Sequence, residues 1–233
     1  SQGISRGDRA VILSENRPEW ALADYGCLCT GVIDVPIYPT LTSSQVAYAL
    51  KDSGAKLVFA SSYEQVIKVL EAVVECPQEI QIVVFDSLSE MPAGVLSWEG
   101  FLKLGAAAPF SAVSDEDFRR SALEAQPDDV ATIIYTSGTT GDPKGVMLTH
   151  NNISSNVQVC STLLPVVPGA DNTVSFLPLS HILQRTSDYL FFRTGCRIGY
   201  PRSIPTLIQD MGVIRPTVVV SVPRIYEKIY NNV

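Results

Sequence analysis

The segment at residues 135–145 reads YTSGTTGDPKG and directly follows the apolar run at residues 130–134. It holds three glycines, four serines or threonines and one lysine within eleven positions. Glycines let backbone N–H groups point at a single anion, because no side chain blocks the approach and a positive φ costs little. The hydroxyls add hydrogen-bond donors, and Lys144 adds a mobile positive charge. This composition predicts a cradle for the β and γ phosphates of a nucleotide.

The spacing within the loop differs from two familiar phosphate motifs. A Walker P-loop needs Gly-Lys-Ser/Thr, whereas Lys144 follows Pro143 and precedes Gly145. The stretch also has no G-x-G-x-x-G dinucleotide fingerprint. The alternative that stays open at this point is a solvated Ser/Thr/Gly loop that joins two strands.

Short apolar runs alternate with amphipathic stretches along the rest of the chain, which is typical of β-α-β units. Most of the runs are continuously apolar, as expected for strands of a parallel sheet that is covered on both faces. The sequence therefore predicts an α/β fold. The expected strands are residues 10–14, 32–37, 56–60, 80–85, 131–136, 173–177 and 217–221.

Capping residues predict where two of the helices begin and end. Asn16 can cap a helix that has Pro18 in its first turn. Ser43 or Ser44 opens another helix, and Gly54 closes it.

Composition and charge narrow the classes of function. With 17 Lys+Arg against 24 Asp+Glu the 233 residues carry a net charge of −7, and 46% are hydrophobic against 18% charged. These values are those of a globular chain and exclude a disordered, collagenous or coiled-coil one. Because the longest basic run is the pair Arg119 and Arg120, we expect neither a nucleic-acid partner nor a polybasic membrane patch.

The cysteines and the apolar stretches indicate in which cellular compartment the chain is expected and whether it crosses a membrane. Five cysteines, scattered and odd in number, fit reduced thiols in the cytoplasm better than a disulfide framework. The most apolar stretch, residues 20–38, is interrupted by Asp24, Asp34 and Pro36, so we do not expect it to span a membrane.

Four segments of the chain resemble a known family. Residues 135–150, YTSGTTGDPKGVMLTH, resemble the phosphate-binding signature of the adenylate-forming (AMP-binding) enzymes, a superfamily of acyl-CoA synthetases, luciferases and peptide-synthetase adenylation domains. Three segments resemble long-chain fatty acyl-CoA synthetases more narrowly and in the family's order: GDRAVILSENRPEW at 7–20, FLPLSHILQR at 176–185 and RPTVVVSVPRIYEKIY at 215–230. The resemblance covers almost the whole chain. It implies the large N-terminal domain of these synthetases, in which helices cover parallel-sheet layers.

The resemblance implies the chemistry of a long-chain fatty-acid CoA ligase. Such an enzyme joins a fatty carboxylate to the α-phosphate of ATP, releases pyrophosphate, and then lets the thiol of coenzyme A displace AMP. Two anions must meet in the first step. At about 4 Å and an effective dielectric near 20, like unit charges repel by roughly 4 kcal/mol, so Mg²⁺, lysine and backbone dipoles are needed to neutralise them.

By similarity, site roles can be assigned to residues of the loop and to one histidine. Thr136 would be the loop's ligand to Mg²⁺, and Lys144 would act in catalysis as well as in binding. His181 follows an apolar run where a strand hands over to a helix, so the resemblance implies a place beside the carboxylate and the acyl pocket, against a plain helix-capping or structural role. The residues that would hold the triphosphate are Thr136, Ser137, Gly138, Thr139, Thr140, Gly141 and Lys144.

Several segments that the family needs do not occur in these 233 residues. The sequence contains no Tyr-Gly-x-Thr-Glu segment and no later Thr-Gly-Asp segment, and the hinge and the small C-terminal domain are missing as well. We therefore expect residues 1–233 to be a partial, incomplete N-terminal domain without turnover of its own. The stretch 91–127, rich in Pro and Gly, is expected to separate subregions 1–110 and 111–233.

Two other functions stay open. The chain could belong to another adenylate-forming ligase, such as an aryl-CoA ligase or a fatty acyl-AMP ligase, or it could be a non-catalytic nucleotide-binding module. Fatty substrates partition into bilayers, so peripheral membrane contact is left open too. The sequence does not indicate an oligomeric state.

Overall fold

A computed structural model describes residues 3–107, 114–136 and 141–230. The chain divides into two compact units, Ser1–Asn152 and Ile153–Val233. Each unit is described by itself.

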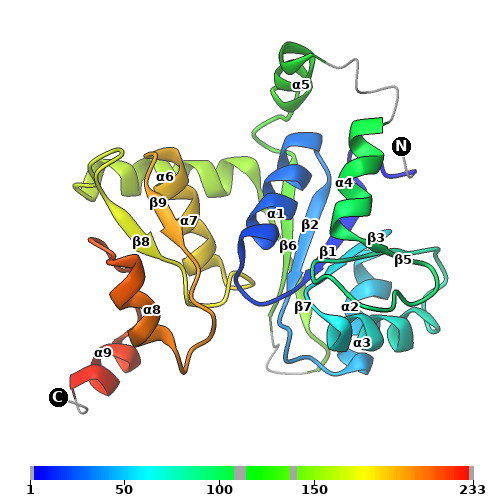
Figure 1. The fold of residues 1–233 in the computed structure, drawn as a ribbon. Helices are drawn as coiled ribbons and strands as arrows, with labels where there is room; N and C mark the ends of the chain where they lie inside the picture. Colours follow the sequence, from blue (N-terminus) through cyan, green and yellow to red (C-terminus); the bar gives the residue numbers. More distant parts are fainter. Residues whose placement is uncertain (1–2, 108–113, 137–140, 231–233) are drawn as a thin grey trace. The chain divides into compact units, whose positions relative to one another are not determined.

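The first unit is built on one mostly parallel sheet, in the strand order β5-β4-β3-β1-β2-β6-β7 (Figure 1). All neighbours run parallel except β6 and β7, which form an antiparallel pair. The strands are β1 (Arg9–Leu13), β2 (Ile33–Ile37), β3 (Leu57–Ala60), β4 (Gln81–Val84), β5 (Val95–Ser97), β6 (Val130–Thr136) and β7 (Lys144–Thr149).

Helices cover both faces of this sheet. Val11 of β1 is in register with Val35 of β2 and Val58 of β3, and all three are fully buried in a core that α2 and α3 complete. On the other face, the ring of Phe59 lies 6.0 Å from that of Trp98 at the start of α4. The helices of this unit are α1 (Pro18–Thr30), α2 (Ser43–Ser53), α3 (Tyr63–Val73), α4 (Trp98–Ala107) and α5 (Asp115–Ala122), and α6 (His150–Leu163) begins in it.

Two helices begin where expected, α1 with Pro18 in its first turn and α2 at Ser43, but their capping residues differ. Arg17, not Asn16, is the N-cap of α1, because Pro18 occupies the first helical position and the residue directly before it must be the cap. Arg17 makes no side-chain cap bond, and its guanidinium pairs with Glu19 at 2.7 Å instead. Thr42, not Ser43 or Ser44, caps α2.

The end of α2 is confirmed. Gly54 stands at its C-cap in the left-handed region, with φ 61°, where a residue with a side chain would be strained.

The second unit holds two parallel strands and three complete helices within its described residues. Its core centres on the buried side chains of Val174, Phe176 and Leu207. The elements are β8 (Asn172–Val174), α7 (Ile182–Arg193), β9 (Arg197–Gly199), α8 (Leu207–Ile214) and α9 (Pro223–Tyr230).

One expected strand of this unit is wrong. Residues 217–221 form no strand but only an isolated bridge between Val218 and Thr173. The N–H groups of Thr217 and Val218 both donate to the carbonyl oxygen of Asn172, so the ladder does not continue along the segment.

The division into units also differs from the expected subregions 1–110 and 111–233. The stretch 91–127 does not separate two compact units, because the chain returns after it to the first sheet. There β6 pairs with β2, with Thr132 opposite Asp34.

Among the described residues, no helix combines the length and the apolar character that crossing a bilayer requires.

Candidate functional site

The predicted phosphate loop joins the two antiparallel strands β6 and β7. Thr136 ends β6, Lys144 begins β7, and the two residues are register partners. Ser137, Gly138, Thr139 and Thr140 lie outside the described residues. The structure therefore places the two ends of the loop.

The pairing of β6 with β7 determines the direction in which the side chains at the two ends of the loop point. Side chains directly opposite each other in an antiparallel pair lie on the same face, with Cβ atoms about 5 Å apart. Thr136 and Lys144 are such a pair, and both are exposed. The hydroxyl of Thr136 and the ammonium group of Lys144 therefore lie on the same face of the strand pair, where the loop begins and ends.

The hydroxyl of Thr136 is chemically suited to be the one protein ligand of a Mg²⁺ ion. Among the described residues, no group of three or more His, Cys, Asp or Glu side chains could hold a metal ion by itself. Mg²⁺ in phosphate sites keeps several waters and takes further oxygens from the substrate, so one exposed hydroxyl next to a bound triphosphate is a compatible donor.

Gly141 and Gly145 each have a stereochemical reason to be glycine. Gly141 has φ 137°, which side-chain-bearing residues rarely adopt. A Cβ on Gly145 would lie 2.8 Å from Cγ2 of Ile133 and 3.5 Å from the ring of Tyr135. The close approach to Ile133 therefore leaves no room for a side chain at Gly145, whereas the distance to the Tyr135 ring is an ordinary contact.

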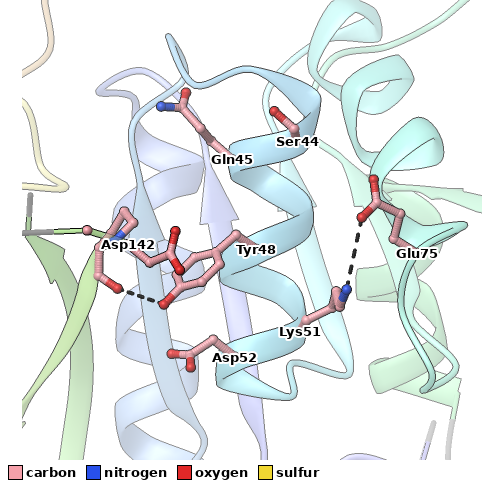
Figure 2. Close-up of a pocket in the computed structure, with 9 residues that line it drawn as sticks. Ser44, Gln45, Tyr48, Lys51, Asp52, Glu75 and Asp142 are labelled. Atoms are coloured by element: carbon pink, nitrogen blue, oxygen red, sulfur yellow. Dashed lines mark hydrogen bonds and ion pairs between the residues drawn. The ribbon is translucent and has the colours of Figure 1, made fainter.

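Helix α2 contacts the loop from the side. The hydroxyl of Tyr48 donates to the carbonyl oxygen of Pro143 at 2.9 Å, a contact drawn as a dashed line in Figure 2. The hydroxyl of Tyr135 donates to Oδ2 of Asp52 at 2.6 Å. The two tyrosine rings pack edge to face, with centroids 6.1 Å apart.

Burial and neighbouring carboxylates keep both phenols protonated. Burial raises the pKa of Tyr135, and the hydrogen bond to Asp52 raises it further. Burial also raises the pKa of Tyr48, with Asp52 and Asp142 adding to the effect. Both hydroxyls are therefore donors at neutral and moderately alkaline pH.

A polar cavity of about 750 Å³ lies between α2 and the end of the loop (Figure 2). Lys51 and Glu75 form an ion pair of 4.0 Å at one side of it, away from the loop. Its lining consists of Ser44, Gln45, Tyr48, Lys51, Asp52, Glu75, Gly141, Asp142 and Pro143.

His181 lies in the second unit, at the N-cap of α7. Its Nδ1 accepts a hydrogen bond of 3.2 Å from the backbone N–H of Leu183, and the residue is exposed. This bond requires the ring proton to sit on Nε2 in the neutral imidazole. The capping role is thus shown, and the substrate role implied by the resemblance stays a prediction.

Polar side chains of α7 bond to one another and to the segment that follows β8. Oε1 of Gln184 accepts a hydrogen bond of 3.2 Å from the backbone N–H of Leu177, and Nε2 of Gln184 donates to Asp188 at 2.7 Å. Arg185 is 1% exposed, and its Nε donates to the hydroxyl of Tyr189 at 2.7 Å.

The sequence did not predict that Tyr48 and Asp52 of α2 contact the loop and Tyr135. Tyr48 and Pro143 are 95 residues apart, and Tyr135 and Asp52 are 83 apart. No local pattern signals such pairs. The one available hint was the spacing of Tyr48 and Asp52, which places them on one face of the predicted helix.

The chain matches known proteins over its whole length. The AMP-binding enzyme family matches residues 1–233. Long-chain-fatty-acid–CoA ligase FadD15 of Mycobacterium bovis is 35% identical over 99% of this chain and 37% of its own length. Peroxisomal long chain acyl-CoA synthetase 7 of Arabidopsis thaliana is 33% identical over 99% of this chain and 33% of its own length. The chain thus spans about a third of these relatives.

Solved structures share the fold. The inhibitor-bound N-terminal domain of FACL13 from Mycobacterium tuberculosis superposes with a TM-score of 0.73 at 25% identity, over 96% of this chain and 52% of that one. With a family match from the first residue to the last, and with the glycine-rich loop carried by a mostly parallel α/β sheet, the chain belongs to the AMP-binding enzyme family.

Proposed function

We propose that this chain carries the triphosphate-binding part of an ATP-dependent, AMP-forming long-chain fatty-acid–CoA ligase. The observation that carries the proposal is the register pair of Thr136 and Lys144 at the mouth of the glycine-rich loop. The relatives that share its whole length bear the names of long-chain fatty-acid CoA ligases and synthetases, which supports the choice of acid.

The proposed reaction has two steps. An oxygen of the fatty carboxylate attacks the α-phosphorus of ATP, and the bond from that phosphorus to the bridging oxygen breaks to release pyrophosphate. The thiolate of coenzyme A then attacks the acyl carbon, and AMP leaves. Bound Mg²⁺ would supply positive charge to the phosphate oxygens.

The residues of this chain would act mainly through charge and position. Lys144 would neutralise the triphosphate, which lowers the repulsion that an incoming carboxylate meets. Thr136 would offer its hydroxyl to the metal, and Ser137, Gly138, Thr139, Thr140 and Gly141 would supply further donors. His181, whose Nδ1 accepts from Leu183, would have its Nε2–H available to donate to the carboxylate.

Binding of MgATP by residues 1–233 tests the phosphate site. Lys144→Met should weaken the affinity by about tenfold or more, because a hydrogen bond from a charged group to phosphate is lost. Isothermal titration calorimetry measures the change. Lys103→Met is the matched control, since the side chain of Lys103 is 81% exposed on α4 and should leave binding unchanged. Equal affinity in the Lys144→Met variant contradicts the proposed site.

The choice of acid is tested with an enzyme that contains this chain. Pyrophosphate release should be greatest with long-chain fatty acids. A maximum with short or aromatic acids indicates another adenylate-forming ligase, and nucleotide binding without release indicates a non-catalytic module. Residues 1–233 alone should release none, because their sequence lacks the acidic Tyr-Gly-x-Thr-Glu segment.

The cytoplasmic location also remains a proposal. All five cysteines lie in the described part of the chain, where none is joined in a disulfide. One of the relatives is named as peroxisomal, so the compartment is to be measured by localising the tagged protein in cells.

A further inference from the structure

One face of α2 holds both strands of the hairpin at the base of the predicted phosphate loop. Tyr48 and Asp52 are four residues apart and therefore neighbours on that face. Tyr48 contacts Pro143, the residue directly before β7, and Asp52 contacts Tyr135, the next-to-last residue of β6. The helix thus bridges the two ends of the loop from outside.

The contact from Tyr48 falls next to the lysine of the site. The accepting carbonyl belongs to Pro143, whose peptide bond joins it to Lys144. The ring of proline fixes φ of Pro143, so a hydrogen bond on its carbonyl removes much of the remaining freedom of this peptide. The position of the Lys144 Cα, from which the side chain extends, is thereby restricted.

The contact from Asp52 fixes the other end. The Tyr135 hydroxyl is held by a charge-assisted bond of 2.6 Å, and Tyr135 directly precedes Thr136. The edge-to-face packing of Tyr48 on Tyr135 joins the two contacts into one unit. Gly145 lies opposite Tyr135 in the pair of strands, and a Cβ there would crowd Ile133 on the same strand as Tyr135.

We propose that Tyr48 is a positioning residue for Lys144: through Pro143 it holds the base of the loop in the form that receives phosphate. This inference rests on the proposed triphosphate site. A Pro143–Lys144 peptide that is already held in place loses less conformational freedom when the anion binds, so the hydroxyl of Tyr48 strengthens binding without touching the ligand.

The hydroxyl contributes little to the core. Tyr48 is only partly buried, and its hydroxyl faces a polar cavity beside Asp142 (Figure 2). When the hydroxyl is removed, water can reach the Pro143 carbonyl from this cavity. The proposal therefore predicts a separation between loop order and overall stability.

Tyr48→Phe in residues 1–233 tests this separation, with Tyr63→Phe as the matched control. Tyr63 is a 54% exposed tyrosine at the start of the neighbouring helix α3. In Tyr48→Phe the amides of β7 should exchange with deuterium faster than in wild type, and the affinity for inorganic tripolyphosphate with Mg²⁺ should fall about fivefold. The melting temperature should stay within about two degrees of wild type. Tyr63→Phe should change none of the three.

The outcomes separate this inference from the proposed function. Unchanged exchange of β7 in Tyr48→Phe overturns the positioning role, and so does faster exchange with unchanged phosphate affinity. A large fall in melting temperature with matching loss of binding shows a structural role instead. If wild type does not bind tripolyphosphate at all, the phosphate site is wrong and the positioning role with it, whereas the exchange comparison still reports whether Tyr48 orders the hairpin.

Discussion

Gly145 shows how a single residue decides the geometry at the end of the loop. A Cβ at this position would lie 2.8 Å from Cγ2 of Ile133, which is too close for any side chain. Gly145→Ala should therefore push Ile133 aside and lower the free energy of unfolding by about 1–3 kcal/mol. Urea denaturation measures this. Gly26→Ala in α1 is the opposite control, because a Cβ there meets no atom within 4 Å and alanine favours a helix.

His150 offers a second test at the scale of one residue. Burial lowers its pKa from the ordinary value of 6.5, and the nearby charge of Arg6 adds to this while Asp129 opposes it. The folded state therefore binds fewer protons than the unfolded state just below pH 6.5, and the contribution of His150 to stability is lost as the pH falls through this window.

NMR titration measures the histidine directly, since the chain contains only two. The Cε1–H signal that disappears in His150→Gln should have its midpoint below 6.5. A midpoint at or above that value contradicts the effect of burial. The variant changes the first residue of α6 (His150–Leu163), so its fold is to be checked by circular dichroism.

At the scale of elements, the start of α2 depends on a capping box. The side chain of Thr42 accepts from the backbone N–H of Gln45, and the Gln45 side chain accepts from the backbone N–H of Thr42 at 3.0 Å. Thr42→Ala should lower the free energy of unfolding by about 1 kcal/mol. Thr162→Ala, on the exposed side of α6, should cost nothing, because its hydroxyl only bonds a carbonyl of its own helix.

The same variant checks the positioning role from another direction. Tyr48 lies in the second turn of α2, beyond the residues that the capping box holds. Thr42→Ala should therefore leave tripolyphosphate affinity unchanged while it lowers stability. Loss of both together would show that the whole helix, rather than the Tyr48 hydroxyl, sets the loop.

Six of the seven strands expected from the sequence are present in the structure. They could be predicted because strands that are buried on both faces read as continuous apolar runs. The edge strand β7 was not predicted, because its apolar run at residues 146–148 is only three residues long. Val146 is 44% exposed and Met147 65% exposed, so the segment shows neither a buried run nor a clear alternation. The strand exists because its backbone pairs with β6, which no side-chain pattern reveals.

The site was predictable to a similar degree. The glycines, hydroxyls and Lys144 are adjacent in sequence, so their composition alone indicates an anion site. Tyr48 and Asp52 come to the loop only because α2 packs beside the hairpin, a contact between segments more than 80 residues apart. His181 was placed correctly at the start of a helix, and its part in binding the acid stays a prediction.

At the scale of the whole molecule, the sequence predicts the α/β class but not where the compact units divide. The Pro- and Gly-containing stretch 91–127 favours a boundary near residue 110. In the structure the chain instead returns to the first sheet with β6, whose Thr132 hydroxyl donates to the carbonyl oxygen of Asp34 at 3.1 Å. Both residues are fully buried, so this pairing belongs to the interior of the first unit.

The difference between the expected boundary near residue 110 and the observed boundary after residue 152 can be tested with two shortened chains. Residues 1–152 contain all seven strands of the first sheet and should fold alone, with cooperative thermal unfolding and slow deuterium exchange in β1 to β3. Residues 1–110 lack β6 and β7 and should be much less stable, because β2 loses its neighbour and Asp34 its covering strand. Circular dichroism and exchange measure both chains. Equal stability of the two would show that the sheet does not need β6, and aggregation of residues 1–152 would show that the first unit depends on the rest of the chain.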